Sequence, residues 1–287
     1  MRPFEYFEPE NLTEALEILH RYGEKAKVLA GGTDLVVQMK QKKLAPEAIV
    51  NIVRLRDLAA VEILQEGPRP ALRLGPLTLL STLATHPCLP RHLGLLREAA
   101  LAVGDPQIRN AATIGGNLAN GSPSADMAPS LMVLGAAVEL QSAGGSRTIP
   151  IEEFYLAPFK TRMTPEELIV GINIQPIPEG GGVYLWMPKR TTVDETLVGV
   201  AAWLQQDPAT GICEKVALSL NSVSPVPTRA KEAESFLLGK VATPQLFKEA
   251  GEIASRGVFP RSRADYRRRI VSVLTGKALE KAWMKNS

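Results

Sequence analysis

Two glycine-rich segments constrain what this chain can fold into more than any other feature. The first reads AGGTDL over residues 30–35, and the second reads TIGGNLANGSPSAD over residues 113–126. A glycine pair lets the backbone take positive φ angles and bring several N–H groups to one anion. A pyrophosphate between two bulky groups can use two such turns. The sequence therefore predicts a dinucleotide-like cofactor held in a cleft between two lobes.

Length and composition indicate a protein of several lobes. The 287 residues exceed the usual size of one hydrophobic core, so we expect two or three lobes. The net charge of +3 is too small to indicate nucleic-acid binding. One local excess of positive charge predicts either a solvated helix face or a subunit contact. It consists of Arg261, Arg263, Arg267, Arg268 and Arg269.

The sequence also predicts where in the cell the protein is located. No segment is apolar over the roughly 18 residues that a membrane-spanning helix needs. The N-terminal residues lack the apolar core of a signal peptide. We therefore expect a cytoplasmic protein without a membrane span.

Cysteine and histidine usage limits the chemistry that this chain can perform alone. An iron–sulfur cluster generally needs four thiolates, and the chain has only Cys88 and Cys213. The three histidines, His20, His86 and His92, do not have the spacing of a zinc site. Any redox chemistry in this chain would therefore require an organic cofactor.

Local patterns predict an α+β chain in three parts: residues 1–57, 58–177 and 178–287. In the last part strands precede helices, which favours α+β over a doubly wound sheet. Residues 176–182, rich in proline and glycine, are the best candidate for a linker. Expected strands are 27–30, 48–52, 61–65, 71–74, 138–141, 147–149, 168–174, 183–187, 197–205 and 212–221. Expected helices are 11–22, 33–40, one from residue 78, 89–103, one containing Pro129, 230–238, 244–255 and 265–282.

The two glycine segments differ in how specific they are. A single glycine pair is often only a tight turn, but Gly31-Gly32 lies between a strand and a helix that Thr33 or Asp34 could cap. The second segment adds several small polar side chains and apolar flanks. Its Asp126 could accept a hydrogen bond from a ribose or ribityl hydroxyl, or it could cap the next helix.

Several common motifs are missing from the sequence. There is no Gly-x-Gly-x-x-Gly after a first strand, no phosphate loop and no nucleophile elbow. No pair among Asp34, Asp105, Asp126 and Asp194 indicates acid–base catalysis. A flavin needs little such help, because its ring system carries the electrons.

The two segments together resemble the FAD-binding medium subunit of molybdenum hydroxylases, a family that includes carbon monoxide dehydrogenase and xanthine dehydrogenase. The resemblance extends over nearly the whole chain, through residues 4–6, 74–78, 107–110 and 262–268. It implies a two-lobed FAD-binding fold of the vanillyl-alcohol oxidase and p-cresol methylhydroxylase type, plus a C-terminal α+β domain.

The resemblance also implies which residues contact FAD. The first segment would line the pyrophosphate and the ribityl chain through backbone amides: Lys27, Val28, Leu29, Ala30, Gly31, Gly32, Thr33, Asp34 and Leu35. The second would complete that cradle: Thr113, Ile114, Gly115, Gly116 and Asn117. Asp126 would hold FAD from the other lobe, and Val103, Ile169 and Lys189 match positions near the flavin. The stretch 189–194 departs from the basic–aromatic pattern of the family, so the residue that tunes the exposed flavin edge is open.

The resemblance implies an electron-transfer subunit. A large subunit would hold the molybdenum cofactor, and a small subunit would hold two [2Fe-2S] clusters. The complete complex would be a dimer of heterotrimers. FAD of this chain would pass electrons to NAD, a quinone or another acceptor. Two alternatives stay open, namely a stand-alone FAD-dependent oxidoreductase of the same fold superfamily and a scaffold without flavin. No histidine adjoins a glycine segment, so we expect FAD to be bound non-covalently.

Overall fold

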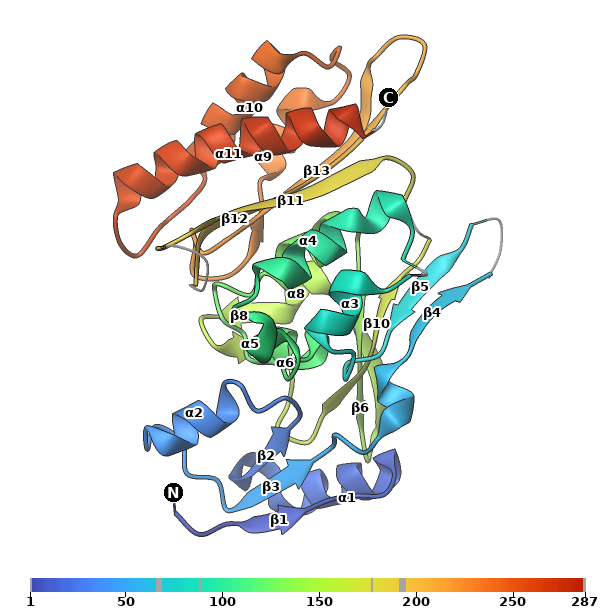
Figure 1. The fold of residues 1–287 in the computed structure, drawn as a ribbon, viewed down its shortest axis with the longest axis vertical. Coiled ribbons are helices and arrows are strands. Elements are labelled where there is room, and N and C mark those ends of the chain that lie inside the picture. The colour runs from blue at the N-terminus through green and yellow to red at the C-terminus, as the bar shows by residue number, and fades with distance from the viewer. Residues whose placement is uncertain (1, 66–68, 88, 177, 191–194, 286–287) are drawn as a thin grey trace.

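The computed structural model describes residues 2–65, 69–87, 89–176, 178–190 and 195–285. These residues form three tiers along the long axis of the molecule, with the N-terminal lobe at one end and the C-terminal domain at the other (Figure 1). Each tier has its own sheet, and three clusters of buried apolar side chains stabilise them. The boundaries at residues 57 and 177 stay predictions.

The N-terminal lobe is a parallel three-stranded sheet with two helices. The strand order is β1-β3-β2, with Lys27 of β2 opposite Ile49 of β3. Asn11 caps the first helix: its Oδ1 accepts the N–H of Glu14 at 3.0 Å, as the cap pattern predicts. In chain order the elements are β1 (Glu5–Phe7), α1 (Leu12–Tyr22), the 3-10 helix Gly23–Lys25, β2 (Ala26–Leu29), α2 (Leu35–Lys40), β3 (Ala48–Asn51) and the 3-10 helix Arg56–Ala59.

The middle lobe is an antiparallel sheet in the order β4-β5-β10-β6-β7, with short helices beside it. Its strands are β4 (Val61–Leu64), β5 (Ala71–Leu74), β6 (Ala137–Ser142), β7 (Gly145–Pro150) and β10 (Leu168–Ile174), with a separate hairpin of β8 (Tyr155–Ala157) and β9 (Lys160–Thr161). Its helices are α3 (Leu80–Thr85), the 3-10 helix Arg91–Leu93, α4 (Gly94–Ala102), α5 (Pro106–Arg109), α6 (Ile114–Ala119), α7 (Met127–Val133) and α8 (Ile151–Phe154).

The C-terminal domain packs an antiparallel sheet between two layers of helices. One face of the sheet contacts α9 and α11, with α10 packed on these two helices, and the other face contacts α4 and α7 of the middle lobe. The middle core therefore includes Tyr184, Ala201 and Trp203 from this domain. Its elements are β11 (Gly181–Pro188), β12 (Thr196–Gln206), β13 (Cys213–Asn221), β14 (Thr228–Arg229), α9 (Lys231–Leu237), α10 (Pro244–Arg256) and α11 (Ala264–Met284).

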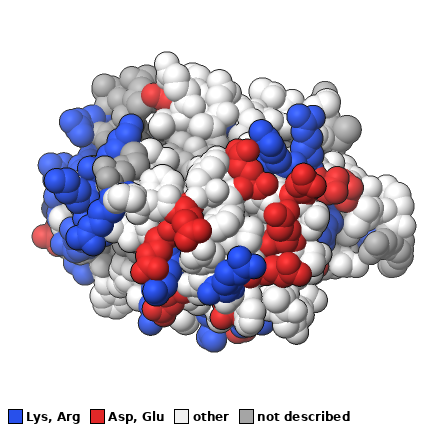
Figure 2. Space-filling model, turned by 90° about the horizontal axis from the view of Figure 1, so that it is seen from below, with Lys and Arg blue, Asp and Glu red and all other residues white. Residues whose placement is uncertain are grey.

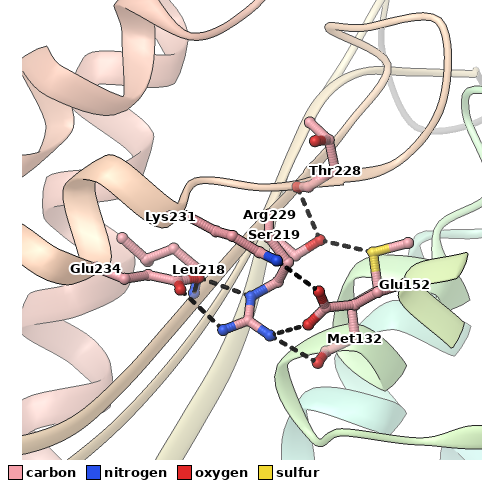
Figure 3. A network of polar contacts seen from close by, with 8 residues as sticks. All are labelled: Met132, Glu152, Leu218, Ser219, Thr228, Arg229, Lys231 and Glu234. Atoms are coloured by element: carbon pink, nitrogen blue, oxygen red, sulfur yellow. Dashed lines mark hydrogen bonds and ion pairs between the residues drawn. The ribbon is translucent and has the colours of Figure 1, made fainter. Parts of the chain in front are cut away.

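A polar network also joins this domain to the middle lobe (Figure 3). Arg229 donates to Glu234 of its own domain at 2.7 and 2.9 Å and to Glu152 of α8. Lys231 adds an ion pair with Glu152 at 3.2 Å. Because Arg229 is mostly buried, removing one partner would leave a desolvated charge, so the network fixes the two parts relative to each other.

Most expected elements are confirmed, including the hairpin of β6 and β7 and the three C-terminal helices. The helix expected over 89–103 begins only at Gly94, after a 3-10 turn. The helix expected from residue 78 begins at Leu80, with Leu79 and not Thr78 at the cap position, and the hydroxyl of Thr78 donates instead to the carbonyl of Ala59 at 3.2 Å. The sequence did not predict β1, whose side chains are mostly exposed and therefore show no alternation.

Charges on the N-terminal end of the molecule are mixed. Figure 2 shows Lys and Arg gathered along one edge of this face and Asp and Glu nearer its middle.

In the arginine-rich segment, Arg267 is half-buried and donates to the carbonyls of Leu197 and Ser222, so it joins α11 to the sheet. Among the described residues, no helix is both long and apolar enough to cross a membrane.

Candidate functional site

The first glycine segment lies at the carboxyl end of a parallel strand. Lys27, Val28 and Leu29 belong to β2, and Leu35 begins α2. Ligands of open sheets bind outside the carboxyl ends of parallel strands. The turn between the two elements, residues 30–34, is only partly buried. It is therefore a surface that a ligand can reach.

The backbone amides of this turn are unpaired. The N–H groups of Gly31, Gly32, Thr33 and Asp34 donate to no atom of the described residues. Asp34 precedes α2 but forms no capping bond, because its backbone is in the helical region and not in the extended one that capping requires. The expected cap is therefore wrong. A run of free N–H groups remains, and such groups bind phosphate oxygens.

The second segment uses its amides within the protein. Its glycine pair forms the first turn of α6, where Thr113 Oγ1 accepts the N–H of Gly116 at 3.1 Å. The N–H of Ile114 donates to Thr78 O at 3.0 Å, and that of Gly115 to Pro76 O at 2.8 Å. The N–H of Asn117 donates to Thr113 O at 3.0 Å. These four amides are thus bonded within the protein, and the expected contact of these residues with FAD stays a prediction.

The glycines are required for different reasons than the sequence suggested. Of the four, only Gly32 has a positive φ, at 69°. A Cβ on Gly31 would lie 2.0 Å from the carbonyl oxygen of Ala111, and one on Gly115 would lie 2.5 Å from Pro76 Cβ. A Cβ on Gly116 would meet only Thr113 Oγ1, at 3.0 Å. Close approach, not backbone conformation, therefore explains Gly31 and Gly115.

The contact of Gly31 with Ala111, two residues before the second segment, brings the two segments close together, although they belong to different lobes. Figure 1 shows α5 and α6 facing β2 and α2 across this junction. Asn117 extends the group, because its Oδ1 accepts the N–H of Met127 at 3.4 Å, next to Asp126. The two glycine segments and Asp126 thus form one continuous region.

Asp126 is buried and faces the C-terminal domain. Its Oδ1 accepts hydrogen bonds from Tyr184 Oη at 2.6 Å and from Asn221 Nδ2 at 3.3 Å. It makes no capping bond to α7, so the capping alternative is wrong. Burial raises the pKa of this carboxyl to about 6, although the bonds from Tyr184 and Asn221 favour the ionised form.

The three remaining predicted residues belong to other elements of the fold. Val103 ends α4 in a loop held by Arg109, which donates to the carbonyls of Val103 and Gly104 at 3.0 and 2.8 Å. Ile169 is buried in the core of the middle lobe. Lys189 is exposed in the C-terminal domain just after β11, and residues 191–194 of the same stretch lie outside the described residues.

Sequence reasoning missed Tyr184 and Asn221, the partners of Asp126. One signal was available, namely Gly199 in the middle of β12. A Cβ there would lie 1.9 Å from Asn221 Oδ1 and 2.2 Å from Tyr184 Oη. A glycine inside a strand often marks such a close approach. The sequence alone does not say which groups approach.

Comparisons with known proteins show the family of this chain. A model described as the FAD binding domain in molybdopterin dehydrogenase matches residues 2–177, and one described as the CO dehydrogenase flavoprotein C-terminal domain matches residues 184–282. The carbon monoxide dehydrogenase medium chain of Afipia carboxidovorans is 32% identical, over 97% of this chain and 96% of its own. The glyceraldehyde dehydrogenase medium chain of Sulfolobus acidocaldarius is 31% identical, over 96% and 97%.

A solved structure of carbon monoxide dehydrogenase from Hydrogenophaga pseudoflava matches with a TM-score of 0.92 and 31% identity, covering 100% of both chains. The mixed fold expected from the resemblance, an FAD-binding part of two lobes plus a C-terminal α+β domain, is confirmed. The chain therefore belongs to the family of FAD-binding subunits that includes the medium chain of carbon monoxide dehydrogenase.

Proposed function

We propose that this chain binds one FAD, non-covalently, at the junction of the N-terminal and middle lobes. The observation that carries the proposal is the run of unpaired amides over residues 31–34, beside the contact of Gly31 with Ala111. These N–H groups suit the pyrophosphate oxygens. Gly116 is exposed, and a Cβ added to it would have only one close contact, with Thr113 Oγ1. There is therefore room for a ligand between Gly116 and the first turn.

Asp126 has the chemistry to accept a hydrogen bond from a hydroxyl of FAD. It lies beside the second segment and is ionised above a pH of about 6. The remaining predicted contacts, Val103, Ile169 and Lys189, rest on the family resemblance alone. When bound, FAD supplies the capacity to accept a pair of electrons and to pass them on, while the chain positions it and controls access to it.

We further propose that the chain works only within a molybdenum hydroxylase complex. Electrons would reach the FAD of this chain from a large molybdenum subunit through the clusters of a small [2Fe-2S] subunit, because two cysteines cannot hold a cluster here. The assembly would be a dimer of such heterotrimers, located in the cytoplasm. The named relatives act on carbon monoxide and glyceraldehyde, so family membership does not fix the substrate.

Purification from the native host under mild conditions, followed by metal analysis and mass measurement, tests this assembly. We expect an iron–sulfur subunit and a larger molybdenum subunit to copurify, with the mass of two copies of each chain. The isolated chain with FAD should show no hydroxylase activity and at most slow reduction by NADH or a dye. Substrate turnover by this polypeptide free of iron and molybdenum would favour the stand-alone flavoenzyme instead.

The mode of FAD attachment is tested separately. Acid treatment should release all of the FAD, because no histidine adjoins a glycine segment. The rings of two histidines also contact other side chains: His20 pairs with Glu166 at 2.7 Å, and the ring of His92 packs against Trp203. Flavin that stays with the precipitated chain would contradict non-covalent binding. A folded chain that takes up no FAD at saturation would contradict the proposed function itself.

A further inference from the structure

The C-terminal domain contributes a buried polar cluster directly to Asp126. Tyr184 comes from β11, Thr196 from β12 and Asn221 from β13, and all three side chains are almost fully buried. Asp126 comes from the start of α7 in the middle lobe. One carboxylate of the FAD-binding part is thus enclosed by three strands of another domain.

The cluster is built around the tyrosine hydroxyl. Tyr184 Oη lies 2.6 Å from Asp126 Oδ1 and 3.1 Å from Asn221 Oδ1. A hydroxyl donates one hydrogen, and the shorter contact to a charged acceptor takes it. Gly199 leaves the space for this arrangement, since any side chain there would occupy the position of Tyr184 Oη.

Tyr184 is itself held firmly in place. Its backbone N–H donates to Glu98 Oε2 of α4 at 2.7 Å, and its ring stacks on Trp186 with 6.1 Å between the centroids. Ser124 Oγ donates to Glu195 at 2.8 Å, and the N–H of Ser222 donates to Pro123 O at 2.8 Å. The loop that leads to Asp126 is therefore attached to the C-terminal domain at several points.

We propose that Tyr184 is a positioning residue for FAD. It fixes the orientation of the Asp126 carboxylate, so that the affinity of the FAD-binding part depends on a side chain of the C-terminal domain. This inference rests on the proposed contact between Asp126 and an FAD hydroxyl.

The charges around Asp126 agree with this role. The hydrogen bonds from Tyr184 and Asn221 favour the carboxylate, whereas burial and the nearby charge of Glu195 favour the protonated acid. The pKa of Tyr184 is raised well above its usual value by burial and by Asp126, so its hydroxyl keeps its proton and stays a donor. Removing that donor raises the pKa of Asp126. FAD binding that needs the carboxylate then weakens at neutral pH and recovers only at higher pH.

The test compares two tyrosine variants by titrating the FAD-free chain with FAD over a range of pH. Tyr184→Phe removes only the hydroxyl, and we expect its Kd for FAD to rise about tenfold near pH 7, with the pH midpoint of binding moved upward. Tyr155→Phe is the matched control, because that buried hydroxyl has no partner among the described residues. Its Kd and its pH midpoint should equal those of the wild-type chain.

A second background separates positioning from general stability. In an Asp126→Asn chain the further change Tyr184→Phe should leave the Kd within about twofold, because the two residues act through one contact. Equal additional losses in both backgrounds, or an unchanged Kd in Tyr184→Phe alone, would overturn the inference. If Tyr184→Phe does not fold, Asn221→Ala, which removes the weaker donor, should raise the Kd by a smaller factor. An unchanged Kd there would equally overturn it.

This failure is distinguishable from a failure of the proposed function. If the wild-type chain binds FAD and the tyrosine variant binds it equally well, only the role of Tyr184 is contradicted. If the wild-type chain binds no FAD, the proposed site itself is wrong.

Discussion

The two glycine pairs look alike in the sequence but present their backbones differently. At Gly31-Gly32 the turn leaves successive N–H groups without an acceptor in the described part of the chain, and one glycine touches the other lobe. At Gly115-Gly116 the same two letters begin a helix whose first amides bond to the carbonyls and the hydroxyl around them. A glycine pair therefore shows where the backbone comes close to something, not which donors are free.

Neighbouring elements explain the difference. The second pair lies beside a chain segment, residues 76–78, whose carbonyls accept its N–H groups, and Thr113 supplies a cap. The first pair follows the end of β2, where the parallel ladder stops after Leu29 accepts from Ile52. This difference supports the proposal that the first turn holds the phosphates, whereas the second turn packs within the middle lobe.

Gly31→Ala should have the largest effect on this comparison. Its methyl group would lie 2.0 Å from Ala111 O, so the lobes must separate or the turn must move. Overpacking of this kind costs on the order of 1–3 kcal/mol or more. If this strain falls on the FAD-bound state, the affinity for FAD decreases about tenfold to a hundredfold. Fluorescence titration with FAD measures this.

Gly144→Ala is the control for Gly31→Ala, since a Cβ there meets only Ser142 Oγ at 3.7 Å. It should leave both affinity and melting temperature unchanged. An equal affinity for FAD in Gly31→Ala and the wild-type chain would break the assignment of the cofactor to this junction.

Asp126→Asn should come next, with a loss of about 1.5–3 kcal/mol in FAD binding if a charged acceptor is lost. In the FAD-free chain the raised pKa means that Asp126 contributes stability below pH 4, which is lost as the pH rises through about 6. FAD binding has the opposite sign and strengthens as the carboxylate forms. From pH 5 to pH 8 the calorimetric affinity for FAD should therefore rise, with a falling Kd, while the melting temperature of the FAD-free wild-type chain should fall.

The asparagine variant should lose this pH dependence and should melt no lower than the wild-type chain at pH 8, because it removes a buried charge. Lower stability with unchanged FAD affinity would show that Asp126 is only a structural residue of the domain junction.

Gly32→Ala should have an intermediate effect. A left-handed conformation costs a residue with a side chain about 1–2 kcal/mol, and Gly32 has a φ of 69°. The Cβ would also lie 3.0 Å from Leu29 Cδ1. We expect the melting temperature and the FAD affinity to fall together, because the free amides depend on this turn. A chain that melts earlier but binds FAD normally would place the phosphates elsewhere.

Gly116→Ala should have the smallest effect and so sharpens the comparison. Its φ is not positive and a Cβ meets only Thr113 Oγ1, so the fold should change by less than about 0.5 kcal/mol, helped by the better helix propensity of alanine. FAD affinity should fall less than in Gly31→Ala. A greater loss of affinity than in Gly31→Ala would reverse the roles of the two turns.

The sequence was sufficient for elements with clear local signals. The cap at Asn11, the hairpin around Gly144 and the long apolar run of β12 each follow from residues near one another. Pairing between distant segments was not predictable in this way. The strand β1 exists because β3, far along the chain, provides its ladder.

The candidate site shows the same limit. Local sequence identified the glycines and Asp126, but the free or bonded state of each amide depends on distant carbonyls such as that of Pro76. Likewise, the bond from Tyr184 to Asp126 joins two domains, and only Gly199 gave a sign of it.

Hydrogen exchange of the backbone amides, with and without saturating FAD, tests the central claim most directly, because it reads the two turns in one experiment. We predict that FAD slows exchange over residues 31–34, where the N–H groups are unpaired, and leaves residues 114–117, already bonded, slow and nearly unchanged. Unchanged exchange over 31–34, with new protection confined to 114–117, would contradict the account.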